Sequence, residues 1–261
     1  MNTLKRTLGC SALAASLIAQ TPFTGGNDRY AARSAQPTAA SGYGKTVYFS
    51  NYAWKVKVAS PPVGPGPNYF SDSANNVWTD TANRLHLRIA RTAGKWVCAE
   101  VVLQQSLGYG TYRFYLDSPV DNLDPNVVLG LFTWSDDPAY YNREMDIEFA
   151  RWSKASNPNA QYTVQPYTIP SQQMIFIEPA GLPQTTNSFK WQAGSVLFQS
   201  LRGFSPDPTP ANTIIAQQLF TQRVPPTGGE NVRMNLWLFQ GKAPLSKNAT
   251  EIIVNRFEFA P

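Results

Sequence analysis

The chain has 261 residues, of which only 15% are charged, and its formal net charge at pH 7 is +5. It contains 7 Trp, 12 Tyr and 14 Phe, together with 21 Pro and 17 Gly. This composition excludes a disordered chain and a helical bundle, and it favours short strands joined by turns. Lys and Arg are scattered along the chain rather than clustered, which argues against a nucleic-acid-binding face.

Residues 1–19 have the pattern of a secretory signal peptide, because the basic start MNTLKR precedes the short apolar run TLGCSALAASLIA. Cleavage would remove Lys5 and Arg6 and lower the formal charge from +5 to +3. An uncleaved anchor, or a lipoprotein modified at Cys10, is the alternative. No later run of 18 apolar residues predicts a stable membrane span. We therefore expect a secreted or periplasmic protein.

Residues 20–42 are rich in Ala, Thr, Ser, Gly and Pro, which predicts a flexible leader before one domain at 43–261. After signal cleavage only Cys98 remains, so no internal disulfide is expected. Cys98 lies in an apolar run and is expected to be a small buried core residue.

The domain reads as a succession of short strands separated by Asn-, Pro- and Gly-rich links. The strand-like runs are 46–58, 84–90, 95–105, 110–118, 126–134, 144–152, 161–167, 174–179, 188–203, 231–239 and 251–261. Many alternate apolar and polar residues with period two, and none has the pattern of an amphipathic helix. We therefore predict an all-β fold, a two-sheet antiparallel sandwich or jelly roll.

Two of these runs predict which side chains face the core. Leu85, Leu87 and Ile89 share one face of their strand, and Ile253, Phe257 and Phe259 are expected to share a face near the C-terminus. His86 is the only histidine, which argues against a Ser-His-Asp triad and a multi-His metal site. We expect His86 to be an outward polar strand residue.

The run EMDIEF alternates three acids with three apolar residues. In a strand, Glu144, Asp146 and Glu148 would share one face while Met145, Ile147 and Phe149 pack in the core. Neighbouring carboxylates repel one another, so this row does not help a purely structural strand. Repulsion can keep one carboxyl protonated beside an ionised one, which is the division of labour that glycoside hydrolysis needs. A Ca²⁺ site and an ordinary solvated strand face are the alternatives.

The spacing of the three acids fits this chemistry. Cα atoms four residues apart in a strand are separated by roughly 13 Å, whereas retaining glycosidases need carboxyl groups about 5–5.5 Å apart. The long side chains of Glu144 and Glu148 can lean toward each other, with the shorter Asp146 between them. Phe132, Trp134 and Trp152 flank the acids, and aromatic rings there suit a saccharide site, although a Trp can equally pack in a core.

The chain resembles glycoside hydrolase family 16, the laminarinase, lichenase and xyloglucan-transglycosylase group, from about residue 69 to the C-terminus. The resemblance is carried, in order, by SLGYGTYRFYLDSP, EMDIEF, NSFKWQAGSVLFQ and MNLW. It implies a β-jelly roll with a concave cleft that hydrolyses β-glycosidic bonds with retention of configuration.

The resemblance also implies roles for individual residues. Glu144 would be the nucleophile, Asp146 the assisting acid and Glu148 the general acid/base. The cleft residues implied by the family are Asn68, Glu100, Phe132, Trp134, Gln165, Tyr167, Asn235 and Trp237, and Trp152 joins them as the aromatic residue after the acids.

Some positions depart from the family pattern. Asn142 stands where lichenases have a Trp two residues before the nucleophile, and the preceding loop, SDDPAYYNR, differs in character. The calcium-binding Asp of the family is Asn255 here, so no metal or other cofactor is expected and a structural calcium ion is unsupported.

The sequence therefore predicts a monomeric retaining glycosidase that acts on a β-linked polysaccharide. A β-1,3- or β-1,3/1,4-glucan cleaved in endo mode is the default substrate. A transglycosylase of the same family, or a carbohydrate-binding protein that does not cleave, remains an alternative.

Overall fold

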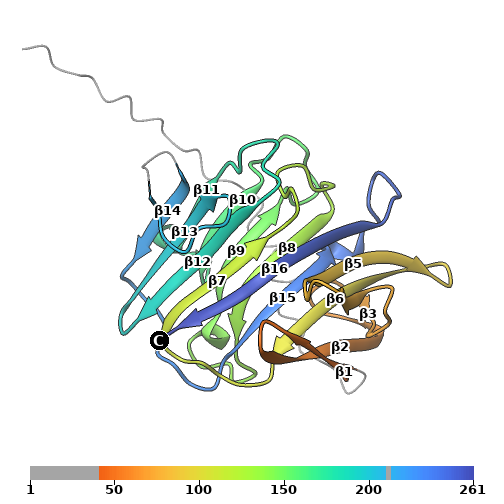
Figure 1. Cartoon of the computed structure of the whole chain (residues 1–261), viewed down its shortest axis with the longest axis horizontal. Coiled ribbons are helices and arrows are strands. Elements are labelled where there is room, and N and C mark those ends of the chain that lie inside the picture. The colour runs from red at the N-terminus through yellow and green to blue at the C-terminus, as the bar shows by residue number, and fades with distance from the viewer. Residues whose placement is uncertain (1–40, 210–212) are drawn as a thin grey trace, which may run out of the picture.

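The computed structural model describes residues 41–209 and 213–261, and within these ranges the chain is almost entirely β-structure (Figure 1). The strands are β1 (Ser41–Phe49), β2 (Tyr52–Val63), β3 (Asn68–Phe70), β4 (Val77–Thr79), β5 (Leu85–Thr92), β6 (Lys95–Leu103), β7 (Gly110–Leu116), β8 (Val127–Trp134), β9 (Met145–Ala150), β10 (Ala160–Val164), β11 (Gln173–Phe176), β12 (Thr185–Gln192), β13 (Ser195–Arg202), β14 (Ile214–Phe220), β15 (Asn231–Leu238) and β16 (Thr250–Ala260). Within the described ranges, the 3₁₀ helices η1 (Tyr141–Arg143), η2 (Pro170–Gln172) and η4 (Phe239–Gly241) lie between strands.

The strands form two sheets that share β5. The first sheet has the order β11-β10-β9-β8-β15-β6 and continues into β2, and the second has the order β5-β16-β7-β12-β13-β14. Residues 90–92 of β5 pair with β6, while its residues 85–89 pair with β16, so the chain curves from one sheet into the other. This architecture confirms the predicted all-β jelly roll.

The core lies between the two sheets. Phe149 and Ile147 of the first sheet and Phe189 and Phe198 of the second are all fully buried. Tyr162 of β10 stacks on Phe198 of β13 and donates a hydrogen bond to Ser200 Oγ at 2.7 Å. Stacking and hydrogen bonding by one residue therefore join the two sheets.

Several sequence expectations are corrected by the fold. The predicted strand at 46–58 is two strands, because Ser50 and Asn51 adopt left-handed φ values of 52° and 65° at a turn. The predicted strand at 144–152 ends at Ala150. The strand β1 begins at Ser41, and the predicted signal peptide and nearly all of the predicted leader lie outside the described residues.

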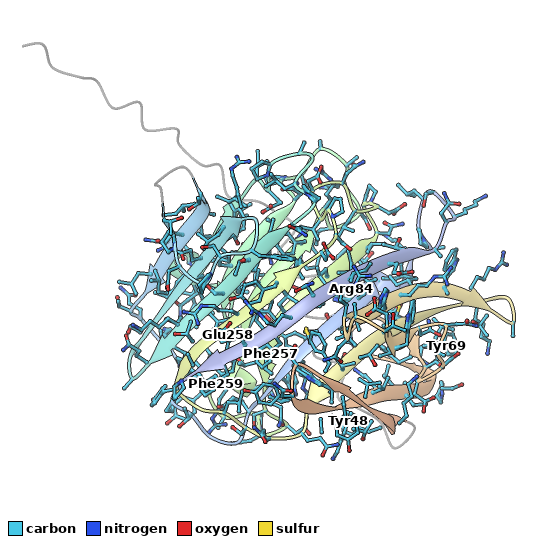
Figure 2. All side chains as sticks on the ribbon, in the orientation of Figure 1. Tyr48, Tyr69, Arg84, Phe257, Glu258 and Phe259 are labelled. Carbon is cyan, nitrogen blue, oxygen red and sulfur yellow. The ribbon has the colours of Figure 1, made fainter. Side chains whose placement is uncertain are left out.

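A β-bulge changes which residues of β16 face the core. Val254 pairs with Leu116 and Arg256 with Tyr115, so Asn255 is an extra residue on β16. Ile252, Val254 and Phe257 are consequently buried, and Ile253 faces the other way, contrary to the strict alternation that the sequence predicted. Figure 2 shows Phe257, Glu258 and Phe259 beyond this bulge, near the end of the strand.

His86 points away from Leu85 and Leu87, as expected, but it is only 7% exposed. Its ring stacks on Trp78 with a centroid separation of 4.5 Å, and its Nδ1 lies 2.8 Å from Glu251 Oε1. His86 therefore lies on the outer face of the second sheet, but Trp78 and Glu251 cover its ring.

Glu178 makes the stability of the fold depend on pH. It is 1% exposed, and burial, reinforced by the charge of Asp121, raises its carboxyl pKa from 4.5 to about 7. The folded state favours the neutral form of the Glu178 carboxyl. The contribution of Glu178 to the free energy of unfolding is therefore complete below pH 4.5 and is lost as the pH rises through 7. We expect the free energy of unfolding to fall by about 3 kcal/mol across this range from this group.

Chemical denaturation at pH 4.5 and pH 8 measures this effect. Glu178→Gln should remove most of the fall, whereas Asp207→Asn, which changes a carboxylate that is 78% exposed, should retain it. An equal fall in wild type and Glu178→Gln would contradict the assignment.

Candidate active site

The alternation predicted for EMDIEF is present in the structure. Met145, Ile147 and Phe149 are fully buried in the core between the sheets. Asp146 and Glu148 lie on the opposite face of β9 and are also buried, with exposures of 0% and 3%. Glu144, the residue that precedes β9, is 4% exposed. We call the side of the first sheet that carries Asp146 and Glu148 the acid face.

Two glutamines, Gln161 on β10 and Gln165 just after it, hold two of the acids. Gln161 is directly opposite Glu148 and donates from Nε2 to Glu148 Oε2 at 2.6 Å. Gln165 donates from Nε2 to Asp146 Oδ2 at 2.9 Å. Trp152 in turn donates from Nε1 to Gln161 Oε1 at 3.3 Å, which fixes the orientation of that amide. These neutral donors stabilise the negative charge of the row without adding a competing cation.

The backbone at the start of the row is held from both sides. Thr133 Oγ1 donates to Arg143 O at 2.8 Å and accepts from Met145 N at 3.2 Å. The backbone N–H of Gln165 donates to Glu144 O at 3.1 Å. Residues 143–145 are therefore fixed between β8 and the end of β10, and the position of Glu144 follows from them.

The loop before Glu144 has an unusual backbone. Tyr140, Tyr141, Asn142 and Arg143 have φ values of 54°, 53°, 61° and 51° in succession. Asn142 closes the loop by donating from Nδ2 to Ser135 O at 2.9 Å. Consecutive left-handed residues other than Gly are energetically unfavourable, and such strain is concentrated at functional sites. The loop SDDPAYYNR, whose sequence departs from the pattern of the resembled family, therefore has four consecutive residues in the left-handed region.

The aromatic residues predicted around the acids occupy different environments. Phe132 of β8 is directly opposite Asp146 and is 5% exposed, and Trp134 lies two residues further along the same face and is partly exposed. Trp152 is 7% exposed and packs edge-on against Trp237 and Phe239. Trp152 therefore supports Gln161 from within an aromatic cluster, and its contact with a substrate stays a prediction.

A second polar cluster lies on the acid face beyond β8. Asn235 of β15 is opposite Glu100 of β6, and its Nδ2 donates to Glu100 Oε2 at 3.4 Å. Lys57 donates from Nζ to the same oxygen at 3.1 Å and to Gly64 O at 2.7 Å. Burial lowers the pKa of the Lys57 ammonium, while the Glu100 carboxylate opposes that shift.

The acid row and this second cluster are connected across β8. Gly130 lies directly opposite both Glu148 and Asn235, and it has no side chain to separate them. Strands in a sheet are about 4.8 Å apart, so Glu148 and Asn235 lie about 10 Å from each other along this lateral row. That span is suited to a chain of sugar rings lying across the strands.

Two buried polar atoms of the cluster have unused hydrogen-bonding capacity. Asn235 Oδ1 and Trp237 Nε1 have no hydrogen-bond partner within residues 41–209 and 213–261. Leaving a buried polar group unpaired costs about 1–3 kcal/mol. Such groups in a predicted binding site are natural partners for the hydroxyl groups of a ligand.

The remaining predicted residues lie at the margins of the site. Asn68 of β3 donates from Nδ2 to Pro65 O and Leu238 O, both at 2.8 Å, so its amide nitrogen braces the backbone. Tyr167 follows Gln165 and donates its backbone N–H to Gln165 Oε1 at 3.0 Å. Contact of Asn68 and Tyr167 with a substrate stays a prediction.

The sequence analysis missed four residues that the fold brings to the site. They are Lys57, Thr133, Gln161 and Arg233. Gln161 could have been found, because it shares the period-two register of Gln165 in the same strand-like run. Nothing local distinguishes Lys57, Thr133 and Arg233, whose roles depend on which strands become neighbours.

The described part of the chain, residues 41–209 and 213–261, contains no cluster of three or more His, Cys, Asp or Glu side chains arranged to bind a metal ion. In the same ranges no helix has the length and apolar character needed to cross a membrane. Cys98 is fully buried as a free thiol.

Comparison with known proteins gives a structural likeness only. No protein-family model matches the sequence, and no curated protein sequence matches it. A β-glucanase from Bacillus licheniformis superposes with a TM-score of 0.53 and 18% identity, over 86% of this chain and 94% of that one. LamA from Z. galactanivorans, solved with laminaritriose and laminaritetraose, has a TM-score of 0.54 and 12% identity, over 84% and 99%. A β-1,3-glucanase from Mycobacterium marinum has a TM-score of 0.53 and 16% identity, over 87% and 94%. This chain therefore has the jelly-roll fold of these β-glucanases.

Two matched tryptophan substitutions test whether the Trp237 indole is held for a ligand. Trp191 and Trp237 are both fully buried, but Trp191 donates from Nε1 to Pro225 O at 3.1 Å, whereas Trp237 Nε1 has no partner in the described chain. We expect Trp191→Phe to lower the free energy of unfolding by about 1–2 kcal/mol more than Trp237→Phe does. Urea denaturation of both variants measures the difference, and equal losses would show that Trp237 Nε1 has a structural partner.

Proposed function

We propose that this protein is a retaining glycoside hydrolase that cleaves a β-linked polysaccharide in endo mode. The observation that carries the proposal is a set of three buried carboxylates at alternate positions, with Glu144 just before β9 and Asp146 and Glu148 on it. Neutral amide donors hold Asp146 and Glu148, and aromatic residues flank them. The likeness in sequence motifs to glycoside hydrolase family 16 and the likeness in fold to β-glucanases support it. A secreted or periplasmic location, which residues 1–19 predict, suits a polymeric substrate outside the cytoplasm.

In the first half of the proposed reaction, a carboxylate oxygen of Glu144 attacks the anomeric carbon of the sugar. The bond from that carbon to the leaving oxygen breaks, and Glu148 transfers its proton to the leaving oxygen. Gln161 donates to Oε2 of Glu148 and so limits the rotation of the carboxyl group. Asp146 lies between the two glutamates along the chain, and Gln165 fixes its position.

In the second half, Glu148 removes a proton from water while the water oxygen attacks the anomeric carbon. The bond to Glu144 breaks, and the sugar is released with its original anomeric configuration. If a sugar hydroxyl replaces water in this step, the same residues would catalyse transglycosylation. The clustered polar side chains of Glu100 and Asn235 would bind the sugar rings beyond β8.

Release of reducing ends from a panel of β-1,3-glucan, β-1,3/1,4-glucan, xyloglucan and sulfated galactan tests the proposed function. Glu144→Gln and Glu148→Gln should each lower kcat at least about 10³-fold, because removing a nucleophile or a general acid costs several kcal/mol in the transition state. Detection of the product anomers by NMR should show retention. No cleavage of any polymer by the wild-type chain, with oligosaccharide binding intact, would favour the non-catalytic binding protein.

Gln161 gives a finer test of the site. It is a positioning residue, and Gln161→Leu should lower kcat about tenfold while KM changes by less than about threefold, since the lost hydrogen bond orients Glu148. The control is Gln217→Leu, which alters an exposed amide that accepts from Gln199 on the second sheet. Equal kinetics for wild type and Gln161→Leu would show that Glu148 needs no such support.

A further inference from the structure

Arg233 is a buried cation on the acid face that the proposed reaction does not use. It lies on β15, directly opposite Phe132 of β8, and Phe132 is in turn opposite Asp146 of β9. Two strand spacings therefore separate Arg233 from Asp146, a lateral distance of about 10 Å. Its exposure is 8%, so little water is available to its guanidinium group.

The guanidinium group of Arg233 is poorly satisfied. Among the described residues, its one hydrogen bond runs from Nη2 to Asp136 Oδ1 and is long, at 3.4 Å. Nη1 lies 3.7 Å from Glu100 Oε1, which is too far for a hydrogen bond. Nε has no hydrogen-bond partner within the described ranges 41–209 and 213–261. A guanidinium has five N–H donors, and a buried charge is costly unless short hydrogen bonds satisfy it.

The neighbouring charged groups do not supply what Arg233 lacks. Glu100 is already bound by the Lys57 ammonium at 3.1 Å, so two buried cations share one buried carboxylate. The Asp136 side chain is 74% exposed and also accepts a hydrogen bond from Trp134 Nε1 at 3.1 Å. Tyr43, whose phenol also lies near Arg233, is neutral in its ordinary form. With Lys57 protonated, the buried groups Lys57, Arg233 and Glu100 together carry one excess positive charge.

We propose that Arg233 binds an oxyanion substituent, a carboxylate or a sulfate ester, on a sugar ring next to the cleavage point. This inference rests on the proposed function and narrows its substrate class from β-linked polysaccharides in general to acidic ones. A carboxylate or sulfate offers two coplanar acceptors, which match the Nε and Nη donors of a guanidinium. Trp134, whose ring centroid lies 5.9 Å from Arg233 Cζ, supplies an aromatic face beside the same position.

The competing interpretation is that Arg233 only helps to hold Glu100. The long 3.7 Å separation and the presence of Lys57 on the same carboxylate argue against that role. The two interpretations differ in a measurable way, because only the anion-binding role makes affinity depend on a charged substituent of the ligand.

The test measures binding in the Glu144→Gln background, where no ligand is consumed. The probes are a β-linked gluco-oligosaccharide, the same backbone oxidised to carboxylates at C6, and the same backbone sulfated at C6. Calorimetry at low and at high salt gives the dissociation constants. We expect at least one anionic probe to bind about tenfold or more tightly than the neutral one, with a preference that weakens in salt. The oxidised and sulfated probes distinguish the two oxyanions.

Arg233→Gln should reduce the preference for the anionic probe to less than about twofold, and Arg233→Lys should retain only part of it, because an ammonium cannot bind in the bidentate manner. Arg256→Gln is the matched control, since Arg256 stacks on Tyr115 of the second sheet with a 4.0 Å separation, and it should keep the full preference. If Arg233→Gln does not fold, the inference is tested by the affinities of Arg233→Lys and by the salt dependence of binding to the wild-type residue.

Equal affinity for neutral and anionic probes would overturn the inference, as would a preference that survives in both Arg233 variants. The proposed function is tested separately, by whether the wild-type chain cleaves any polymer of the panel.

Discussion

The carboxylates of Glu144, Asp146 and Glu148 are buried at alternate positions of one chain segment, and their desolvation and mutual repulsion are the constraint to which the local structure responds. Burying a charged group costs several kcal/mol unless hydrogen bonds or opposite charges compensate it. Gln161 on β10 and Gln165 just after it compensate Glu148 and Asp146 with donors that carry no charge. An arginine or lysine in their place would add a competing cation. Amide donors stabilise a carboxylate and still permit proton transfer.

The fold can hold this row because β9 is an interior strand. It pairs with β8 on one side and β10 on the other, so its backbone is fully engaged and the register is fixed. Met145, Ile147 and Phe149 anchor the opposite face in the core, and a slip of one residue would bury the acids there instead. The same hydrophobic packing that stabilises the sandwich therefore determines where the carboxylates point.

The sequence predicts the features that depend on local alternation, and it misses those that depend on distant partners. The core positions of β9, the sandwich and most strands follow from period-two patterns. The bulge at Asn255 reverses the alternation of β16 through an insertion relative to β7, which no local pattern reveals. Lys57 and Arg233 are 43 and 133 positions from Glu100 in sequence, and only the adjacency of β2, β6 and β15 brings them to the same carboxylate. The strands β3 and β4 were missed because three residues carry too few alternations to be recognised. The strand β14 was missed because its sequence, IIAQQLF, does not alternate apolar and polar residues.

Several charged side chains on and around the second sheet are paired with one another. Arg84 donates to both Asp80 and Asp117 at 2.8 and 2.9 Å, and Arg113 donates to Glu258 at 3.2 Å. On the acid face, by contrast, the guanidinium of Arg233, the amide oxygen of Asn235 and the indole of Trp237 retain unused hydrogen-bonding capacity within the described ranges. Unpaired buried atoms also occur elsewhere in the described part of the chain, at His86 Nε2 and at the carboxyl group of Glu178, but Arg233, Asn235 and Trp237 lie at alternate positions of the single strand β15. The most direct physical reason for this concentration is a polar ligand that completes these hydrogen bonds on the acid face.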